Sequence, residues 1–282
     1  MRPRRCPELS NCVLAAAALL APSSAAAQTW DLTADWSVTQ NPNGVWSYNG
    51  AGGVPIATLI ADYDTGSQAF GTPQPAWAAA PFPQNNHVPV WFKRVSDTCG
   101  FDIPIGSVGM HGNEADDPSV WIGTTWTSPV DEAVDLTGVL WYAHTGIARN
   151  ADWRIRVNDA VITGGNVAWD DGSSSANPTP LANGSGGAPA IDSIPVDPGD
   201  VITLEFKSSN TFACVIGIGL TITVDPCYAD LNEDDVLDLS DVAAFVGAFT
   251  TGLPAADIAE PFGVYDLADV TLFVQEFLAG CP

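Results

Sequence analysis

An acidic stretch near the end of the chain has the residue types and spacing of a cation site. It reads "DLNEDDVLDLSD" and runs from Asp230 to Asp241. A loop of twelve residues that encloses Ca²⁺ offers oxygen atoms from positions 1, 3, 5, 7, 9 and 12. The stretch has oxygen donors at all six positions, if position 7 uses its backbone carbonyl and position 9 acts through a water molecule. We therefore predict a calcium site formed by Asp230, Asn232, Asp234, the carbonyl of Val236, Asp238 and Asp241.

Two positions of this loop depart from the usual pattern. Position 6 is Asp235, where a glycine normally makes the sharp turn, and position 12 is Asp241, which reaches less far than glutamate. Aspartate enters the left-handed region more readily than most residues, so we expect strain of about 1 kcal/mol there and a site that is retained. The alternative interpretation is an acidic loop that is merely solvated.

The loop belongs to an internal repeat with a spacing of 28 residues. "DLSDVAAFVGAF" begins at Asp238 and "DLADVTLFVQEF" begins at Asp266. Apolar residues recur at i, i+3, i+4 and i+7 in both segments, which predicts an amphipathic helix after each loop. Asp241 favours the start of the first helix, and Gly252 and Pro254 favour its end.

The second loop, Asp257–Asp269, is one residue longer and has fewer oxygen donors. Ala259 and Pro261 stand where side-chain oxygens would be needed. The acidic residues that remain in place are Asp257, Asp266 and Asp269. This loop is either a degenerate calcium site or a structural mimic, in which Phe262 and Tyr265 pack where the ion would lie.

Residues 227–282 resemble a dockerin of type I, because they contain two loop–helix halves. The short segments "DPCYA" and "GLPAA" before the loops leave no room for the entering helix of a full EF-hand. The resemblance implies a small all-α domain that binds Ca²⁺ and attaches to a protein partner, such as a cohesin-like or envelope protein. Dockerins contact partners around loop positions 10 and 11, which here are the pairs Leu239-Ser240 and Leu267-Ala268 in place of the usual polar pairs. The final "GCP" is similar to dockerin-like ends of exported proteins from bacteria without cellulosomes.

The first 27 residues have the layout of a secretory signal peptide. Three arginines precede the apolar run Val13–Ala21, and Ala25-Ala26-Ala27 offers small residues before a cleavage at Gln28. The run is shorter than the roughly 20 residues that a membrane span needs. We expect a protein without a transmembrane segment that is secreted, periplasmic or held at the cell surface.

The charge of the chain excludes some classes of partner. The net charge is −24, and removal of residues 1–27 leaves 6 basic and 32 acidic residues, a net of −26. Such a surface repels nucleic acids and anionic membranes.

Four cysteines follow the signal peptide, and an even number in an exported protein suggests two disulfides. Three pairings are possible. Position favours Cys227–Cys281, which brackets the acidic segment, together with Cys99–Cys214 in the larger domain.

Residues 28–226 are predicted to form a β-sandwich with the topology of a jelly roll. Short alternating runs are separated by turn residues, as in "RIRVNDAVITG", where Asn158-Asp159 suggests a hairpin, and in "VDPGDVITLEF". The range Asp170–Gly187 reads as a long polar loop. The pieces "DWSVTQNPNGVWSYNG", "TTWTSPV", "WRIRVND" and "VDPGDVITLEF" resemble an exported β-sandwich family that looks like carbohydrate-binding jelly rolls.

Aromatic and acidic residues give this domain two further candidate sites. Exposed tryptophan and tyrosine rings can stack on sugars. Those in loop-like contexts, which we take as a candidate sugar platform, are Trp46, Tyr48, Trp77 and Trp169. Alternation places Trp126 in the core. The segment His111–Pro118, "HGNEADDP", is either a structural calcium loop or a solvated acidic loop.

The sequence favours an exported, non-enzymatic recognition module that a calcium-ordered tail attaches to a partner. No catalytic motif of a hydrolase or nucleotide-binding enzyme is found. Two alternatives stay open: a polysaccharide-degrading enzyme that carries a dockerin, and a structural protein of the cell surface.

Overall fold

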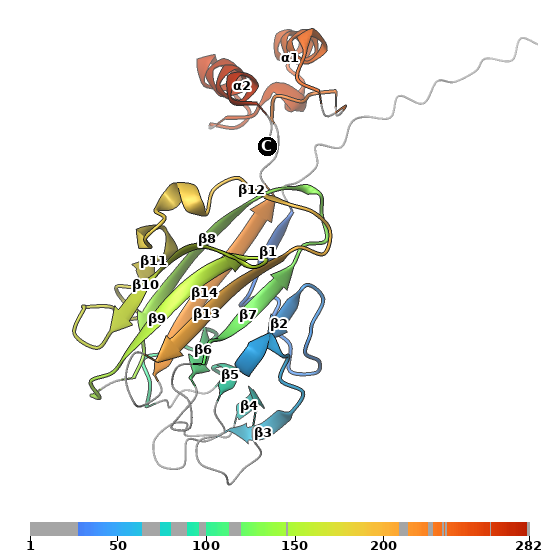
Figure 1. Ribbon diagram of the computed structural model, residues 1–282. Helices are drawn as coiled ribbons and strands as arrows, with labels where there is room; N and C mark the ends of the chain where they lie inside the picture. Colours follow the sequence, from blue (N-terminus) through green and yellow to red (C-terminus); the bar gives the residue numbers. More distant parts are fainter. Residues whose placement is uncertain are drawn as a thin grey trace, which may run out of the picture.

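The computed structural model describes most of the chain after the predicted signal peptide. The described residues are 28–63, 74–79, 89–95, 100–112, 120–144, 146–208, 214–224, 228–232, 234, 236–259 and 261–280. They form two antiparallel β-sheets and, near the C-terminus, two α-helices (Figure 1). The prediction of a mainly β chain followed by a small helical part is therefore confirmed.

The larger sheet, called sheet A, has the strand order β11-β8-β14-β6-β5-β4-β3, with β1 also paired to β14 and β12 to β8. Its strands are β1 (Thr29–Asp31), β3 (Leu59–Tyr63), β4 (Gln74–Ala78), β5 (Val90–Lys93), β6 (Val108–His111), β8 (Glu132–Tyr142), β11 (Thr179–Pro180), β12 (Ile194–Val196) and β14 (Val215–Val224).

The smaller sheet, sheet B, has the order β10-β9-β13-β7-β2. Its strands are β2 (Trp46–Tyr48), β7 (Ile122–Thr127), β9 (Asn150–Val157), β10 (Ala160–Ala168) and β13 (Val201–Ser208). Short 3-10 helices lie in the connections at η1 (Ala51–Gly53), η3 (Leu181–Asn183), η4 (Ala188–Ala190) and η5 (Pro254–Ala256).

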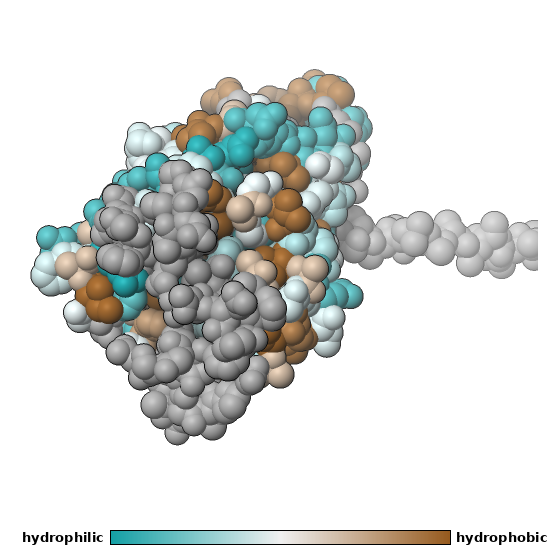
Figure 2. Space-filling view, turned by 60° about the horizontal axis from the view of Figure 1, so that its bottom comes forward, coloured by the Kyte–Doolittle hydropathy of each residue, from teal (hydrophilic) through white to brown (hydrophobic). Residues whose placement is uncertain are grey.

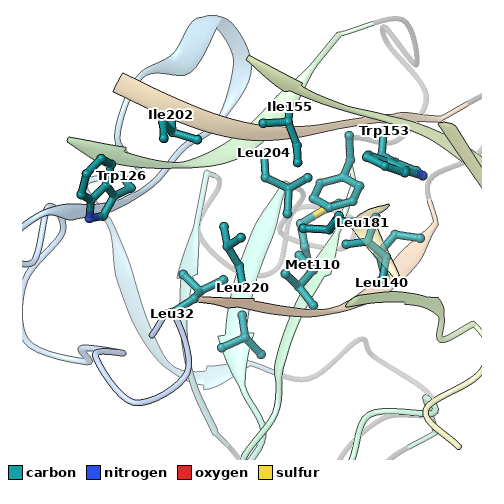
Figure 3. Packing of buried hydrophobic residues seen from close by; sticks show 14 of the residues in the cluster. Leu32, Met110, Trp126, Leu140, Trp153, Ile155, Leu181, Ile202, Leu204 and Leu220 are labelled. Atoms are coloured by element: carbon teal, nitrogen blue, oxygen red, sulfur yellow. The ribbon is translucent and has the colours of Figure 1, made fainter. Parts of the chain in front are cut away.

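The two sheets share one hydrophobic core, to which the central strands β9 and β13 of sheet B contribute alternate apolar residues. Figure 3 shows Ile202 and Leu204 from β13 and Ile155 from β9 pointing across the core toward Leu220 and Leu140 of sheet A. Trp126 is fully buried in this cluster, as its alternation predicts.

Two turns that the sequence predicts are confirmed. Asn158 and Asp159 join β9 to β10, and Asn158 takes the left-handed φ of 51°. Gly199 has a φ of 98° in the turn before β13. The Asn158 amide connects the two turns, since its Oδ1 accepts from the Val201 N–H at 3.0 Å and its Nδ2 donates to Asp200 Oδ1 at 3.0 Å.

The range Asp170–Gly187 differs from the simple polar loop that we predicted. It contains β11, which pairs with β8, and the side chain of Leu181 is completely buried in the main core. An apolar side chain in an otherwise polar stretch therefore fixes this loop to the sandwich.

A second buried cluster covers the outer face of sheet A. It includes Phe92, Phe101, Trp141 and Val215. Gly217 of β14 lies under the Trp141 indole, and a Cβ atom added there would come within 1.9 Å of the ring. Glycine is thus required at this position for the tryptophan to lie flat on the sheet.

The helical tail has a core of its own. Helix α1 (Leu239–Thr251) and helix α2 (Leu267–Ala279) are the helices predicted from the repeat. Phe245 and Phe273 occupy the same place in the two halves and stack with ring centroids 4.1 Å apart and an interplanar angle of 9°. The buried residues of this cluster all lie between positions 229 and 273.

Candidate functional site

The first three predicted calcium ligands lie together in loop one. The backbone N–H of Asp234 donates to Asp230 Oδ1 at 3.2 Å and to Asn232 Oδ1 at 3.1 Å. The Asn232 amide donates to Asp234 Oδ2 at 2.8 Å. The Val236 side chain is 56% exposed, which suits a residue whose contribution would come from its backbone carbonyl.

The last two predicted ligands of loop one anchor the start of α1. Asp241 is fully buried, and its carboxylate accepts from the N–H groups of Asn232 at 3.3 Å and Asp238 at 2.9 Å. Asp238 is the N-cap and accepts from the Ser240 N–H at 2.6 Å. The hydroxyl and the N–H of Ser240 lower the pKa of Asp238 because both stabilise its charged form.

Loop two repeats this arrangement at α2. Asp269 is fully buried, and one of its oxygens accepts from the N–H groups of Ile258 and Ala259, each at 2.9 Å. Its other oxygen accepts from the N–H of Asp266, which caps the helix. Burial alone would raise the pKa of Asp269, but the hydrogen bonds from Asp266, Ala259 and Ile258 lower it.

The surroundings of the Asp257 carboxylate indicate whether loop two could hold a cation. Its Oδ2 accepts from the Gly263 N–H at 2.6 Å, whereas its Oδ1 is shielded from solvent and has no hydrogen-bond partner among the described residues. A shielded carboxylate oxygen without a donor is unfavourable, and a bound cation would relieve it. The residue types and this orphaned oxygen therefore fit Ca²⁺.

The alternative interpretation of loop two, a mimic built from Phe262 and Tyr265, is wrong for Phe262. Phe262 is 67% exposed, so it does not fill an ion-sized space. The Tyr265 hydroxyl donates to the carbonyl of Gly252 at 2.9 Å, and its ring meets Phe249 edge-on. Tyr265 thus joins the two halves of the tail.

Within the described part of the chain, no three His, Cys, Asp or Glu side chains form a group that could hold a metal ion. Glu233, Asp235 and Glu260 lie outside that part. A calcium site in loop one must therefore also use the amide of Asn232 and the carbonyl of Val236, and it stays a prediction.

The helix faces next to the loops are apolar and exposed. The residues at loop position 10, Leu239 and Leu267, are 79% and 75% exposed. About two helical turns further on, Val246 and Val274 occupy matching positions and are 53% and 46% exposed. The tail thus presents the same apolar side chains twice.

The predicted sugar platform is wrong for three of its four members. Trp46, Tyr48 and Trp77 are at most 4% exposed. Trp46 and Tyr48 lie in β2, which pairs with β7, and the Trp77 indole in β4 donates to the carbonyl of Ser37 at 2.9 Å. Only Trp169, of these four, is open to solvent, at 56% exposure.

A groove on the outer face of sheet B was missed by the sequence reasoning. It has a volume of about 700 Å³ and is lined by Trp121 together with charged residues of β9 and β13. Arg154 Cζ lies 4.0 Å and Lys207 Nζ 4.9 Å from the centroid of the Trp121 ring. The signal was present, because the alternation that buries Trp126 puts Trp121 on the opposite face.

The other predicted site residues are placed as follows. Among the described residues Cys214 is a buried free thiol, and the predicted Cys99–Cys214 disulfide is not seen; burial raises the pKa of this thiol to about 12. Cys99, Cys227 and Cys281 lie outside the described residues, as does the predicted signal peptide, and the Cys227–Cys281 pairing stays a prediction. His111 is buried in β6 rather than in an acidic loop, and residues 113–118 are not described.

None of the helices in the described residues combines the length and the hydropathy that crossing a bilayer requires. Figure 2 shows hydrophilic and hydrophobic residues intermixed over the described surface at the lower end of the molecule. Comparisons of the chain with protein-family models, with curated proteins and with solved structures found no match, so the case for a function rests on the geometry of the tail loops and the groove.

Proposed function

We propose that this protein is an exported, non-enzymatic recognition module whose C-terminal tail binds Ca²⁺ and attaches the β-sandwich to another protein at the cell surface or outside the cell. The observation that carries the proposal is the duplicated carboxylate arrangement of the tail. In each half, a buried aspartate, Asp241 or Asp269, binds the backbone of its loop and closes the capping box of the following helix.

In loop one, Asp230, Asn232 and Asp234 would hold the ion together with Asp241 and the Val236 carbonyl. Calcium, when bound, would neutralise carboxylates that otherwise repel one another. Asp238 keeps α1 capped through Ser240, so the helix start stays fixed while the loop closes. In loop two, the shielded Oδ1 of Asp257 is the oxygen that would gain a partner.

The exposed apolar residues at matching positions of the two halves support the attachment role. Leu239 and Leu267 directly follow the capping aspartates, so loop geometry sets their direction. Large exposed apolar side chains that recur in this way are typical of protein-interaction surfaces. A partner with an apolar groove and a polar rim would suit this tail.

Calcium titration of the mature chain tests the proposal. We expect isothermal titration calorimetry to detect Ca²⁺ binding, and circular dichroism at 222 nm to show a more heat-resistant helical signal in calcium than in chelator. Asp230→Ala combined with Asp234→Ala should remove the loop-one event, and Asp257→Ala should remove any loop-two event. Asp170→Ala, a change at an exposed aspartate of the sandwich, serves as the control. Absence of calcium binding at millimolar concentration would refute the calcium-ordered tail.

A further inference from the structure

The groove on sheet B is built by two rows of residues that run across the strands. In one row, Glu205 of β13 lies between Gly123 of β7 and Arg154 of β9, and Gly164 of β10 follows Arg154. A Cβ atom at Gly123 would come within 3.0 Å of the Glu205 side chain. The glycines on both sides of the Arg154–Glu205 pair have no side chains. The pair therefore lies close to the sheet, and the space above it stays open as the groove.

The charged pair at the base of the groove is fixed in position. The Nε of Arg154 donates to Glu205 Oε2 at 2.6 Å, and Arg156 lies 3.7 Å from Glu205 Oε1. Glu205 is only 8% exposed. In the adjacent row, the hydroxyls of Thr125 and Thr203 are 3.2 Å apart. The groove thus offers both hydrogen-bond donors and acceptors from rigid strands rather than from loops.

Trp121 forms one wall of this groove. Its ring is partly exposed, and the guanidinium of Arg154 and the ammonium of Lys207 both lie within 5 Å of the ring centroid. Such cation–π contacts hold an indole in place even though it is not in the core. A positioned, partly exposed tryptophan next to paired polar groups can bind a ring that has one apolar face and several hydroxyls.

The charges of the groove exclude a polyanion as ligand. Three of the six basic residues after residue 27 lie on this face, namely Arg154, Arg156 and Lys207. Each has an acidic partner within 4 Å: Glu205 for Arg154, Asp159 for Arg156 and Asp152 for Lys207. The face is therefore close to neutral, and the rest of the chain is strongly acidic.

We infer that the outer face of sheet B binds a neutral oligosaccharide, with one pyranose ring packed against the exposed part of the Trp121 ring and its hydroxyls bonded to Arg154, Glu205 and the threonine pair. A volume of about 700 Å³ is within the range of ligand sites in proteins. The inference rests on the proposed recognition role of the sandwich, but it does not depend on calcium in the tail.

The test uses the mature full-length chain and isothermal titration calorimetry with the hexasaccharides of cellulose, xylan and mannan, and with hexagalacturonate as an acidic probe. We expect at least one neutral hexasaccharide to bind, and Trp121→Ala to weaken that binding about tenfold or more, since tenfold corresponds to about 1.4 kcal/mol. Trp121→Phe should retain part of the affinity, because the ring is preserved. Trp169→Ala tests the exposed member of the platform predicted from the sequence, and we expect it to bind as the unchanged protein does. Phe262→Ala, at an exposed aromatic residue of the tail, is the matched control.

Several results would overturn the inference. These are failure of every neutral hexasaccharide to bind at millimolar concentration, binding of hexagalacturonate alone, release of new reducing ends, or loss of binding in Trp169→Ala but not in Trp121→Ala. Thermal unfolding of each variant shows whether it is folded. Repeating the sugar titration with chelator separates the two proposals. If the tail proposal fails, chelator leaves the helical signal at 222 nm unchanged, and sugar binding should persist in chelator in either case.

Discussion

Lowering the pH from 7 to 4.5 should destabilise the sandwich through two buried histidines. His111 ends β6 and His144 follows β8, and their exposures are only 4% and 8%. Their rings meet edge-on with centroids 6.2 Å apart. Burial, followed by the positive charges of His144 and Arg149, lowers the pKa of His111 to about 3; burial, followed by Arg149, lowers the pKa of His144 to about 4.

The sign and the size of the effect follow from these pKa values. A histidine in the unfolded chain has a pKa of about 6.5, so below pH 6.5 the unfolded state binds protons that the folded state does not. The stabilisation is fully present above pH 6.5 and is lost as the pH falls toward 4 and then 3. Each pH unit below 6.5 lowers the free energy of unfolding by about 1.4 kcal/mol per histidine. By pH 4.5 the pair has therefore lost about 5 kcal/mol of stability. Domains are stable by only about 5–15 kcal/mol in total.

Urea unfolding at half-unit steps from pH 7 to 4.5 measures this loss. His111→Phe and His144→Phe keep an aromatic ring but cannot titrate. Each should reduce the slope of the unfolding free energy against pH by about 1.4 kcal/mol per unit, whatever its absolute stability. Proton resonances of the two imidazoles, followed by NMR, should stay unchanged above pH 5. An imidazole of this pair that titrates near pH 6.5, or an unchanged slope in both variants, would refute the reasoning.

Two substitutions test the packing of the tail and of sheet A. Phe245→Ala removes one ring of the stacked pair with Phe273 and should destabilise the helical unit by about 3–5 kcal/mol, seen as an earlier loss of the signal at 222 nm; the exposed Val246→Ala is its control. Gly217→Ala places a methyl group inside the Trp141 ring and should lower the melting temperature of the sandwich by several degrees or prevent folding. Gly247→Ala in α1, where a Cβ meets no atom within 4 Å, should be neutral or stabilising, and equal melting temperatures for the two glycine variants would contradict the argument.

Local patterns predicted the parts of the structure that depend on neighbouring residues. The repeat around Asp238 and Asp266 predicted both helices, because capping and amphipathic periodicity are settled within one or two turns. The hairpin at Asn158-Asp159 followed from turn chemistry in the same way. These features need no knowledge of what packs against them.

The prediction of the sugar platform was wrong because the burial of its aromatic residues depends on contacts with distant parts of the chain. Trp46 and Tyr48 have turn-forming neighbours, which indicated a loop, but burial depends on which strand covers them. Here β2 pairs with β7, and that contact joins residues about 80 positions apart. Local composition carries no information about such a pairing, so an aromatic residue beside a turn can equally be core or surface.

One wall of the groove on sheet B could be predicted from the sequence, but the residues that surround it could not. Alternation along "WIGTTWT" already separates Trp121 from Trp126, so an outward tryptophan was predictable from this segment, which comprises Trp121 and β7. Its surroundings were not, because Arg154 and Glu205 are 51 residues apart and meet only through the register of β9 with β13. A shift of that register by one residue would move Glu205 into the core and Leu204 onto the surface. The burial of Leu204 in the core therefore fixes the position of Glu205 beside Arg154, and the same apolar residues that hold the sandwich together determine the polar surface on which we place the sugar.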